Sequence, residues 1–564
     1  MVHVKSLLPE PPSAPIINIS TFLLEREGIP DHILFINSLT GEAWTRARFI
    51  DRVRRLQCLL PTARAQGGFD VHSSEMVAVF SENCIEYVAL MHALWALAIP
   101  FAPCSAYATS NELVHCLRIT GASTIFCHAN RLETTLEAAK VVGIPTSKIY
   151  ILDGETTREF KSIAQLINSA SFPRTLPSKA VPVKKDQLAF VLFSSGTTGL
   201  PKAVALSHNN VIHHTFQRLG WLQSMLQSAS PPPMAPSGGL SVTLGFLPIF
   251  HTYGLHSFCI TPFFLPGTVV LMPRWDTNKG LELIPKHKVT TIVAVPSVIH
   301  QISRSPKLAE TDMSSVFSLA SGAAYLSPSL SKKLSGQVGD KTMSAISMIC
   351  EGQLGGKWRY IEGCSGGLLP GMEARTVRED GTEAEYGETG ELWLKGGNIA
   401  LGYLGNPKAT AETFVDGWLR TGDLFKIDQE GYFWYQDRGK DTLKVSGMQV
   451  SPMEIEEALL RHPGGLVQDV AVAGVDIALR GSTVVERVPR AWVVLTDQGV
   501  KAEPDSVRLE LEAWIQKQLS RYKWLKGGIA FVDQIPKSAT GKVLRRQLVE
   551  EHSRQNPVHV SSRL

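Results

Sequence analysis

The sequence predicts an α/β protein. A large N-terminal domain of layered α/β subdomains plus a β-rich subdomain is expected to precede a small α+β C-terminal domain. Three observations predict this fold class. A chain of 564 residues is too long for one hydrophobic core. Short β-branched runs alternate with helical patterns through the first two-thirds, which is typical of layers with largely parallel strands. From about residue 385, short strands with glycine turns precede a compact mixture of helices and strands.

The predicted elements of the first part are short and bounded by turn residues. Buried strands are expected at 76–83, 123–129, 148–152, 187–194, 267–273 and 289–296. Helices are expected between several of them, including 84–98 and 110–120, the latter with Ser110 as its N-cap. The proline- and glycine-rich stretch 228–239 is predicted to be a loop.

The last part of the chain predicts a second, smaller domain that starts near Arg438. Its expected order is helix 451–462, strand 467–475, strand 489–496, helix 505–520 and strand 527–533. We therefore expect a large domain at 1–437, a small domain at 438–553 and an exposed tail at 554–564.

Composition argues against several classes of protein. The net charge of +4 is near balance and gives no case for binding nucleic acid or an anionic membrane. The eight cysteines are scattered without a Cys-x-x-Cys pair, which disfavours a zinc site or a disulfide framework and fits a reducing compartment. No secretory signal is expected at the N-terminus. The apolar stretches 87–104 and 244–273 hold prolines and histidines, so we expect buried helices and strands rather than membrane spans.

A loop rich in glycine and hydroxyl groups follows the predicted strand 187–194. Glycines let the backbone approach a ligand, and amide and hydroxyl groups donate to anionic oxygens. A lysine adds a positive charge. The spacing is not that of a Walker A loop, and the composition fits either a phosphate-binding loop or a polar turn. Its residues are Ser194, Ser195, Gly196, Thr197, Thr198, Gly199 and Lys202.

Three further motifs follow in a fixed order, with TGD at 421–423, DRGKD at 437–441 and IPKSATGKVLRR at 535–546. Together with the loop, this order resembles the adenylate-forming superfamily, which includes acyl- and aryl-CoA ligases, adenylation domains of peptide synthetases and beetle luciferases. The resemblance covers nearly the whole chain and is closest to 4-coumarate- and fatty-acyl-CoA ligases. It implies ATP, Mg²⁺ and coenzyme A as cofactors, and a small domain that is mobile and rotates about a hinge at Lys440.

The resemblance implies a reaction in two halves. A carboxylate attacks the α-phosphate of ATP to give acyl-AMP and pyrophosphate, and a thiol then attacks the acyl carbonyl and expels AMP. Residues 194–202 would hold the triphosphate, Asp423 the ribose hydroxyls and Arg438 the ribose and phosphate side. Lys542 would bridge the carboxylate and α-phosphate oxygens as they meet. Lys537, five residues earlier, is expected to be a decoy without a catalytic role.

The remaining implied roles concern the acyl group and coenzyme A. His251 would lie beside the carboxylate pocket; alone, it also fits a satisfied core histidine. Arg274 would meet the coenzyme A phosphates, although a surface arginine fits nearly as well. The other matched positions are Lys444 and Gln449, which face the acyl-adenylate, Ser446 and Gly447, which approach coenzyme A, and Ser321, Gly322 and Ala323, which line the acyl pocket.

One family motif is missing. An aromatic-Gly-x-Thr/Ser-Glu segment, whose ring stacks on adenine and whose glutamate helps to bind Mg²⁺, is expected after the acyl-pocket residues and is not found. Glu351 is the nearest acid, but its flanks do not match. A deletion, a gene-model error or divergence would all produce this, so the metal ligand stays unassigned.

The leading function is therefore an ATP-dependent acid–CoA ligase acting on a fatty, hydroxy or aryl acid whose identity the sequence leaves open. The alternatives are an enzyme that loads a carrier protein, a luciferase-like oxygenase, and a catalytically impaired nucleotide- or acyl-binding homologue. The last three residues, Ser562–Leu564, fit an address for the peroxisomal import receptor, with the cytosol as the alternative location.

Overall fold

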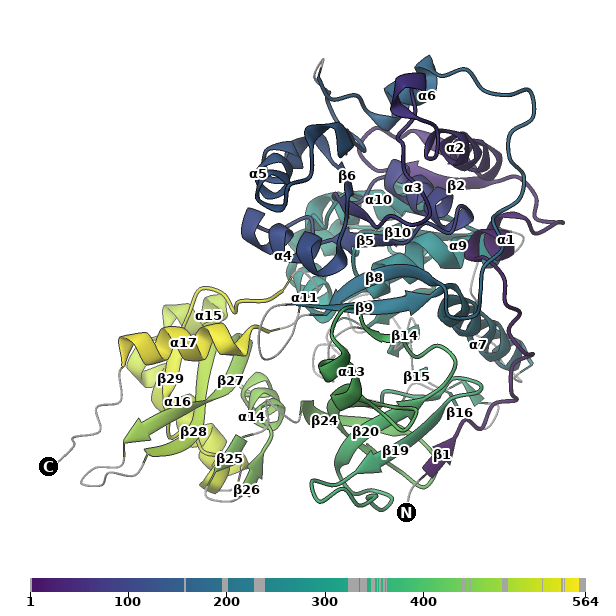
Figure 1. Ribbon diagram of the computed structural model, residues 1–564. Coiled ribbons are helices and arrows are strands. Elements are labelled where there is room, and N and C mark those ends of the chain that lie inside the picture. Colours follow the sequence, from purple (N-terminus) through teal and green to yellow (C-terminus); the bar gives the residue numbers. More distant parts are fainter. Residues whose placement is uncertain are drawn as a thin grey trace, which may run out of the picture.

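The computed structural model describes residues 3–156, 159–194, 201–227, 239–322, 334, 342–345, 350–351, 353–354, 357–358, 361, 363–438, 443–445, 448–478, 485–519, 521–538, 541 and 543–556. Figure 1 shows two stacked sheets with helices in the upper part, a β-rich part below them and a small unit to one side. The predicted fold class is confirmed.

The first seven-stranded sheet has the order β21-β9-β8-β5-β4-β6-β7. Five neighbouring strands, β8, β5, β4, β6 and β7, run parallel to one another. Strand β9 pairs antiparallel with β8, and β21 pairs antiparallel with β9. The strands are β4 Val77–Phe80, β5 Phe101–Cys104, β6 Thr124–Cys127, β7 Ile149–Ile151, β8 Leu188–Ser194, β9 Lys202–Ser207 and β21 Gly402–Tyr403. Its helices are α3 Ile85–Ala96, α4 Ser110–Thr120, α5 Leu132–Val142 and α6 Ile163–Ser169.

The second seven-stranded sheet has the order β14-β13-β12-β10-β11-β2-β3, and every strand except β3 is parallel to its neighbours. The strands are β2 Ile33–Asn37, β3 Ala43–Thr45, β10 Ser241–Gly245, β11 Gly267–Leu271, β12 Thr291–Ala294, β13 Ser318–Ser321 and β14 Thr342–Ala345. Its helices are α1 Ile19–Leu24, α2 Arg46–Leu59, α8 Thr252–Gly254, a π-helix at Leu255–Ile260, α9 Thr261–Phe264, α10 Thr277–His287 and α11 Pro296–Arg304.

Helix α3 lies in the core that the two sheets share. All of its residues are buried, including Glu86 and His92. His92 stacks on Phe263 at 4.3 Å between ring centroids and contacts Trp95 and Phe49 edge-on. The apolar stretches 87–104 and 244–273 therefore form buried helices and strands, as predicted. No helix in the described part of the chain is long and apolar enough to cross a membrane.

The β-rich part is a six-stranded sheet of order β1-β19-β20-β23-β22, with β24 paired to β23. Its strands are β1 His3–Lys5, β19 Glu373–Val377, β20 Gly390–Lys395, β22 Phe414–Val415, β23 Trp418–Ile427 and β24 Phe433–Arg438. Helix α7 (His208–Leu226) covers it, because Trp221 and Met225 pack with Leu369 and Leu394 in one apolar cluster. Nearby short elements are α13 Pro407–Thr413 and the two-residue strands β15 Cys350–Glu351, β16 Gln353–Leu354, β17 Lys357–Trp358 and β18 Gly367–Leu368.

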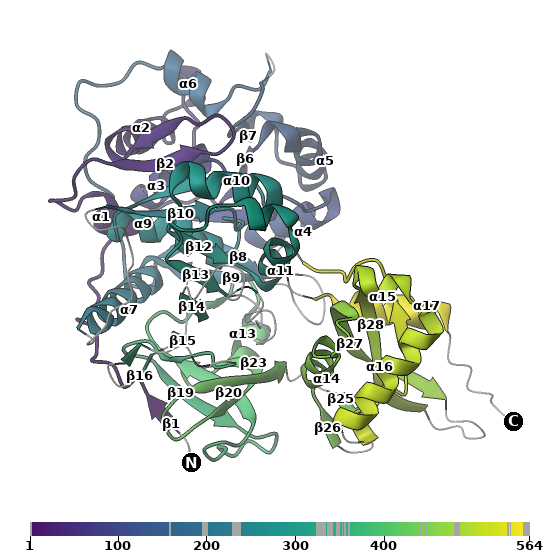
Figure 2. The ribbon, with the colours of Figure 1, turned by 180° about the vertical axis from the view of Figure 1, so that it is seen from behind.

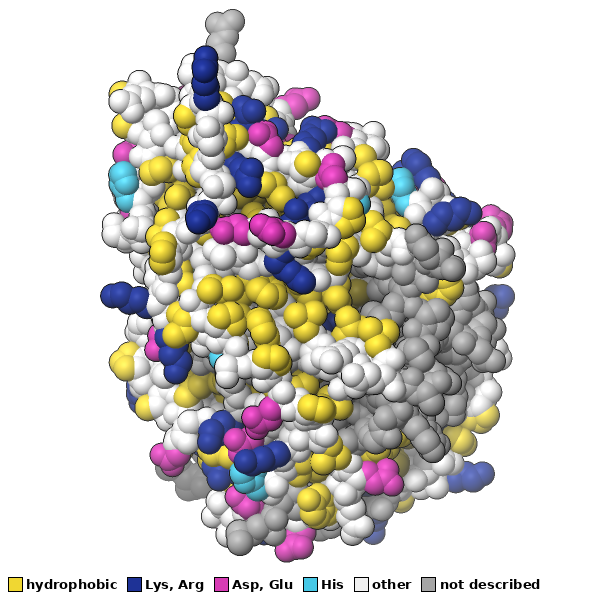
Figure 3. Space-filling view, turned by 90° about the vertical axis from the view of Figure 1, so that its right-hand side faces the viewer, with side chains coloured by type: hydrophobic (Ala, Val, Ile, Leu, Met, Phe, Trp, Pro, Cys, Tyr) yellow, Lys and Arg dark blue, Asp and Glu magenta, His cyan; other side chains and the backbone are white. Residues whose placement is uncertain are grey.

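The N-terminal segment runs from β1 up the side of the molecule to α1 (Figure 1). Ser6 donates its hydroxyl to the Leu368 carbonyl at 2.9 Å, which ties this segment to the β-rich part. On that side of the molecule apolar side chains gather across the middle, with charged side chains above and below (Figure 3). The segment thus links the β-rich part to the layered part.

The small unit contains the sheet β27-β28-β29 and the hairpin β25-β26. Two apolar clusters fill it, and both consist of residues from Leu443 onward. Its elements are β25 Leu443–Val445, β26 Met448–Val450, α14 Pro452–Leu460, β27 Val467–Ala478, β28 Val485–Leu495, α15 Asp497–Lys501, α16 Pro504–Gln518, β29 Ile529–Phe531 and α17 Arg545–Gln555. The boundary near residue 438 and the tail at 554–564 stay predictions, and residues 557–564, which include the predicted address, lie outside the described part.

One predicted helix start is wrong. Ser110 is the first helical residue of α4, and the N-cap is Thr109. The Glu112 carboxylate accepts the Thr109 backbone N–H at 2.8 Å, and the Thr109 hydroxyl accepts from the Glu112 backbone. A Thr with Glu three residues later forms this reciprocal capping box, whereas Ser110 has Leu113 at the corresponding place.

Candidate active site

The carboxyl ends of β10, β12 and β13 lie side by side on one edge of the second sheet. The crossover after β10 leads to β11 on one side, whereas the crossover after β12 leads to β13 on the other, so the strand order reverses between the neighbours β10 and β12. Ligands of open α/β sheets bind outside the carboxyl ends of the strands at such a switch point. His251 lies in the loop after β10, and Gly322 directly follows β13. This edge is therefore the candidate active site.

His251 caps the short helix α8. Its Nδ1 accepts a hydrogen bond from the Tyr253 backbone N–H at 3.3 Å, so the ring proton is on Nε2. Burial lowers the pKa of His251 to about 4, and the ring is neutral near pH 7. A neutral ring can donate one hydrogen bond to a carboxylate but adds no positive charge. His251 thus has a structural capping role and keeps one N–H for a further partner.

Two further histidines, His256 and His214, contact each other just beyond His251. The His256 Nδ1–H donates to the Thr252 carbonyl at 3.0 Å, and its ring meets that of His214 of α7 edge-on at 5.0 Å. Burial lowers the pKa of His256 to about 4, so this pair is also neutral. His256 lies in the π-helix, a feature often found at functional sites. Neither histidine is recognisable as a site residue from the sequence, because no motif marks a contact between α7 and this turn.

Ser321 and Gly322 lie beside the end of β12. Ser321 is 3% exposed and pairs with Ala294 in the parallel register. The Gly322 backbone N–H donates to the Ala294 carbonyl at 3.2 Å. Two of the three residues predicted to line the acyl pocket therefore lie at the edge that also holds His251.

The loop of the small unit that precedes Lys542 reaches the same edge. A Cβ built on Gly541 would lie 2.8 Å from Ser297 Oγ and 3.3 Å from Val295 Cγ2, so the glycine packs closely on the start of α11. Figures 1 and 2 show the yellow segment before α17 extending to α11. The residue next to the predicted catalytic lysine is thus at the carboxyl end of β12.

The predicted phosphate loop leaves the end of β8 and returns at the start of β9, its antiparallel neighbour in the first sheet. Ser194 ends β8 and pairs with Lys202, which begins β9, and the Ser194 hydroxyl donates to the Lys202 carbonyl at 3.4 Å. The Lys202 ammonium lies 4.8 Å from the centroid of the Tyr403 ring. This cation–π contact holds the lysine at the base of the loop. Tyr403 is not recognisable as a neighbour of the loop from the sequence, because only the pairing of β21 with β9 brings it there.

Asp423 and Arg438 are brought together by the β-rich sheet. They are register partners of β23 and β24, although fifteen positions of chain including a turn separate them. The Asp423 backbone N–H donates to the Thr421 hydroxyl at 3.1 Å, and Gly422 adopts φ +72° in this turn.

The predicted coenzyme A and adenylate positions are distributed over two parts of the fold. Lys444 and Gln449 are register partners in the hairpin β25-β26. Arg274 is exposed after β11. The side chains of Arg438, Lys444 and Gln449 lie outside the described part. So do all atoms of the remaining predicted positions, which are Ser195, Gly196, Thr197, Thr198, Gly199, Ala323, Lys440, Ser446, Gly447 and Lys542.

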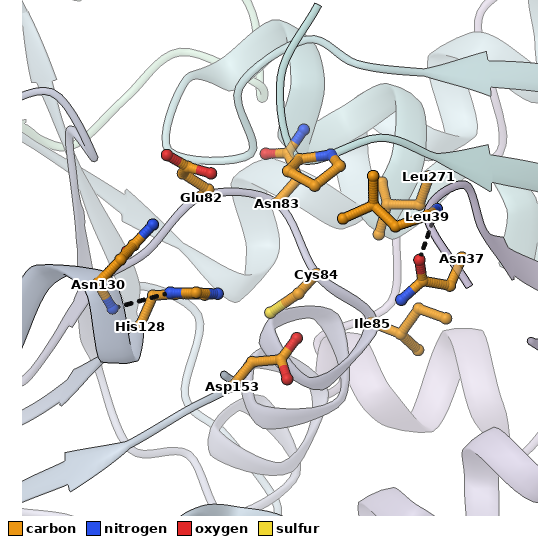
Figure 4. Close-up of a pocket in the computed structure, with 11 residues that line it drawn as sticks. Asn37, Leu39, Glu82, Asn83, Cys84, Ile85, His128, Asn130, Asp153 and Leu271 are labelled. Carbon is orange, nitrogen blue, oxygen red and sulfur yellow. Dashed lines mark hydrogen bonds between the residues drawn. The ribbon is translucent and has the colours of Figure 1, made fainter. Parts of the chain in front are cut away.

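A separate hollow of about 240 Å³ lies between the two sheets (Figure 4). It lies at the carboxyl end of β4, where the first sheet reverses its strand order. Glu82 and Asp153 line it, and Glu82 pairs with Arg131 at 3.0 Å. Two carboxylates would repel phosphate groups. No predicted site residue lines this hollow, and we do not place ATP there.

The described residues contain no group of three His, Cys, Asp or Glu side chains that could hold a metal ion. The side chain of Glu351 lies outside the described part. Strand β14, in the stretch that follows the acyl-pocket residues, pairs in parallel with β13 through Ala345 and Ser321.

Comparisons with known proteins agree with this arrangement. Residues 27–404 match the model of the AMP-binding enzyme family, and residues 454–542 match that of the AMP-binding enzyme C-terminal domain. The acyl-CoA ligase AKT1 of Alternaria alternata is 31% identical over 502 residues, covering 84% of this chain and 82% of that protein. The probable 4-coumarate–CoA ligase 1 of Dictyostelium discoideum is 31% identical over 544 residues, covering 92% of each.

Solved structures show the same likeness. The ATP-bound MatB from Rhodopseudomonas palustris superposes with a TM-score of 0.79 at 26% identity, covering 95% of this chain and 98% of that one. The switch-point edge, the β8–β9 hairpin and the small unit that reaches α11 are thus parts of a shared architecture. The chain belongs to the AMP-binding enzyme family.

Proposed function

We propose that this protein uses ATP to join a carboxylic acid to coenzyme A through an enzyme-bound acyl-AMP. Family membership and the acyl-CoA ligases among its relatives support this reaction. The observation that carries the proposal is the contact of Gly541, one residue before Lys542, with Val295 and Ser297 at the end of β12. A cation delivered there would meet a carboxylate held near His251.

In the first half-reaction a carboxylate oxygen attacks the α-phosphorus of ATP. A new oxygen–phosphorus bond forms, and the bond to pyrophosphate breaks with its electron pair on the leaving oxygen. The ammonium of Lys542 offsets the charge that gathers between the two anions. The neutral His251 ring can orient the acid through Nε2–H without binding it as an ion pair.

In the second half-reaction the sulfur of coenzyme A attacks the acyl carbon. The carbon–oxygen bond to AMP breaks, AMP leaves, and the thiol proton passes to water. Asp423 and Arg438, paired across β23 and β24, would hold the ribose side of the nucleotide during both steps. The hairpin partners Lys444 and Gln449 would face the adenylate, and Arg274 the coenzyme A phosphates.

We also propose Mg²⁺ as a cofactor, because ATP phosphates in transfer need a neutralising cation. When bound, it would supply Lewis-acid stabilisation of the phosphate oxygens. The described residues do not present a donor set that fits it, so we derive no step through the ion.

The deciding experiment measures isotope exchange between pyrophosphate and ATP with a panel of aliphatic, hydroxylated and aromatic acids. Exchange that depends on one acid, followed by acyl-CoA formation on adding coenzyme A, is expected. Exchange without acyl-CoA, but with transfer to a phosphopantetheine carrier, would favour the carrier-loading alternative.

A catalytically impaired homologue is the second candidate, and the missing aromatic-Gly-x-Thr/Ser-Glu motif favours it. Such a protein would bind ATP in calorimetry yet show no pyrophosphate exchange with any acid. Loss of an adenine platform and a metal ligand would lower the rate on the order of hundreds-fold.

A further inference from the structure

The loop that carries Lys542 is closed at its base by Lys537. Lys537 and Val543 form an antiparallel bridge, and the Leu544 backbone N–H donates to the Pro536 carbonyl at 2.9 Å. Within the loop, the Gly541 N–H donates to the Ser538 carbonyl at 2.8 Å. Lys537 and Val543 therefore hold the two ends of the loop together.

An ion pair fixes Lys537 to the sheet of the small unit. Its ammonium lies 2.6 Å from Asp469 Oδ2, and the two side chains are 24% and 29% exposed. Asp469 lies in β27, and its other carboxylate oxygen accepts the Val470 backbone N–H at 3.0 Å. The loop is thus tied to β27 at a defined place.

The large part contacts the same place through His300 of α11. The His300 Nε2–H donates to the carbonyl of Gln468, the residue before Asp469, at 2.9 Å. Burial lowers the pKa of His300 below its ordinary value. The ring is therefore neutral and acts as a hydrogen-bond donor to the backbone beside the ion pair.

Helix α11 contacts the small unit at two points of one face. Ser297 meets Gly541 of the loop, and His300 meets Gln468 of β27. Residues three apart on a helix share a face. One face of α11 therefore contacts both Gly541 in the loop and strand β27, to which the loop is tied through Asp469.

We propose that Lys537, Asp469 and His300 form a latch that positions the Lys542 loop against the large domain while acyl-AMP forms. Lys537 is then a positioning residue, although the sequence motif by itself predicts no role for it in catalysis. This inference rests on the proposed function. It predicts that the latch matters for the first half-reaction and not for the second, which the family resemblance assigns to a different orientation of the small domain.

The test breaks the latch from each side. Lys537→Met and Asp469→Asn remove the ion pair, and His300→Ala removes the contact from the large part while leaving the pair intact. Each variant is expected to lower the kcat of acyl-AMP formation about tenfold, because small misplacements of catalytic groups cost one to two orders of magnitude. The KM for ATP and the rate of thiolation of supplied acyl-AMP should stay within about twofold of wild type.

Two further variants separate positioning from folding. The exchanged pair Lys537→Asp with Asp469→Lys should recover most of the lost rate. The control Lys523→Met breaks a comparable ion pair of the small unit, to Glu454 at 2.5 Å, and should leave both half-reactions unchanged. If Lys537→Met does not fold, His300→Ala still tests the latch, because it leaves the small unit untouched.

Hydrogen–deuterium exchange measures whether the latch protects the backbone amides around it, independently of enzyme activity. In His300→Ala and Asp469→Asn, exchange should rise in peptides covering 296–304 and 535–545 and stay unchanged in β28. Unchanged exchange, an unchanged first half-reaction, or equal losses in both half-reactions would overturn the proposal. Absence of acyl-AMP formation by the wild type with every acid would instead refute the proposed function, while the exchange result would still decide on the latch.

Discussion

Neighbouring residues of one motif have different surroundings in this protein. Lys537 pairs with Asp469 inside the small unit, whereas Gly541 packs on Ser297 of the large part. Gly541 also adopts φ +78°, a conformation that disfavours side chains. At the residue scale, the tip of this loop is adapted to close approach and its base to anchoring.

The first residue-scale prediction concerns Lys542. Lys542→Ala should lower acyl-AMP formation on the order of a hundredfold or more, since one charge-stabilising group contributes about that much. Thiolation of supplied acyl-AMP should stay close to wild type. Single-turnover assays of each half-reaction measure this, with the exposed Lys501→Ala as a control. A wild-type rate of adenylation in the Lys542 variant would exclude the assignment.

The second concerns Gly541. A Cβ at this position would lie 2.8 Å from Ser297 Oγ, and the left-handed backbone adds about 1 kcal/mol of strain. Gly541→Ala should therefore slow acyl-AMP formation about tenfold, and adding Ser297→Ala should recover part of the loss. Gly465→Ala is the matched control, because Gly465 has φ +58° but no atom within 4 Å of a built Cβ. Equal losses in the two glycine variants would show that strain alone, and not the contact, is responsible.

At the scale of elements, the edge formed by β10, β12 and β13 positions the site. The π-helix after His251 brings His256 against α7, and the hairpin β8–β9 holds Lys202 against Tyr403. Strand β14 completes this edge, with Ala345 paired to Ser321. The sequence alone suggests a place just before Ala345 for the missing family motif, and that place lies inside this strand.

This register gives the third prediction. Inserting an aromatic-Gly-x-Ser-Glu segment directly after Ala345 should raise acyl-AMP formation, because it restores an adenine-stacking ring and a carboxylate without shifting β14. An insertion before Ala345 would instead move that residue out of its pairing with Ser321. Pyrophosphate exchange measures the gain, and a Gly-Ser insertion of equal length is the control. Robust activity of the parent protein with no gain on insertion would mean that another acidic residue already binds the metal ion.

At the scale of the whole molecule, the large part shares one extensive core, and buried histidines lie within it. Burial lowers the pKa of His92 to about 3 and those of His208 and His256 to about 4. In the unfolded chain these rings titrate near pH 6.5. Between about pH 4 and 6.5 the unfolded chain therefore binds more protons than the folded one. Their contribution to stability is complete above this window and is lost as the pH falls through it.

The fourth prediction follows from this loss of stability at lower pH. The melting temperature should fall between about pH 7.5 and pH 5. His92→Gln keeps an amide donor for the Cys259 carbonyl, which His92 Nε2 meets at 2.8 Å, but does not titrate. Its melting temperature should depend less on pH, whereas the exposed His72→Gln should show the wild-type dependence. Scanning fluorimetry measures both, and an unchanged pH dependence in His92→Gln would contradict the prediction.

Much of the fold could be predicted from local patterns. The strands predicted at 76–83, 123–129 and 289–296 contain β4, β6 and β12, because a buried parallel strand is a short apolar run between turn residues. Strand β5 (Phe101–Cys104) was missed, since Pro103 is unfavourable in a strand and only the pairing with β4 stabilises it there. Lys202 was placed in the loop but begins β9, because the antiparallel partner β8 extends the strand to it.

By itself the sequence determined the family, the order of its motifs and the chemistry that they imply, because each motif is local and carries its residue types at fixed spacing. The tertiary structure alone decided which of these residues meet. Pairing of β23 with β24 joins Asp423 to Arg438, and the face of α11 brings Ser297 to Gly541 and His300 to β27. Such contacts depend on strand order and on the packing of elements far apart in the chain, and no local pattern encodes them.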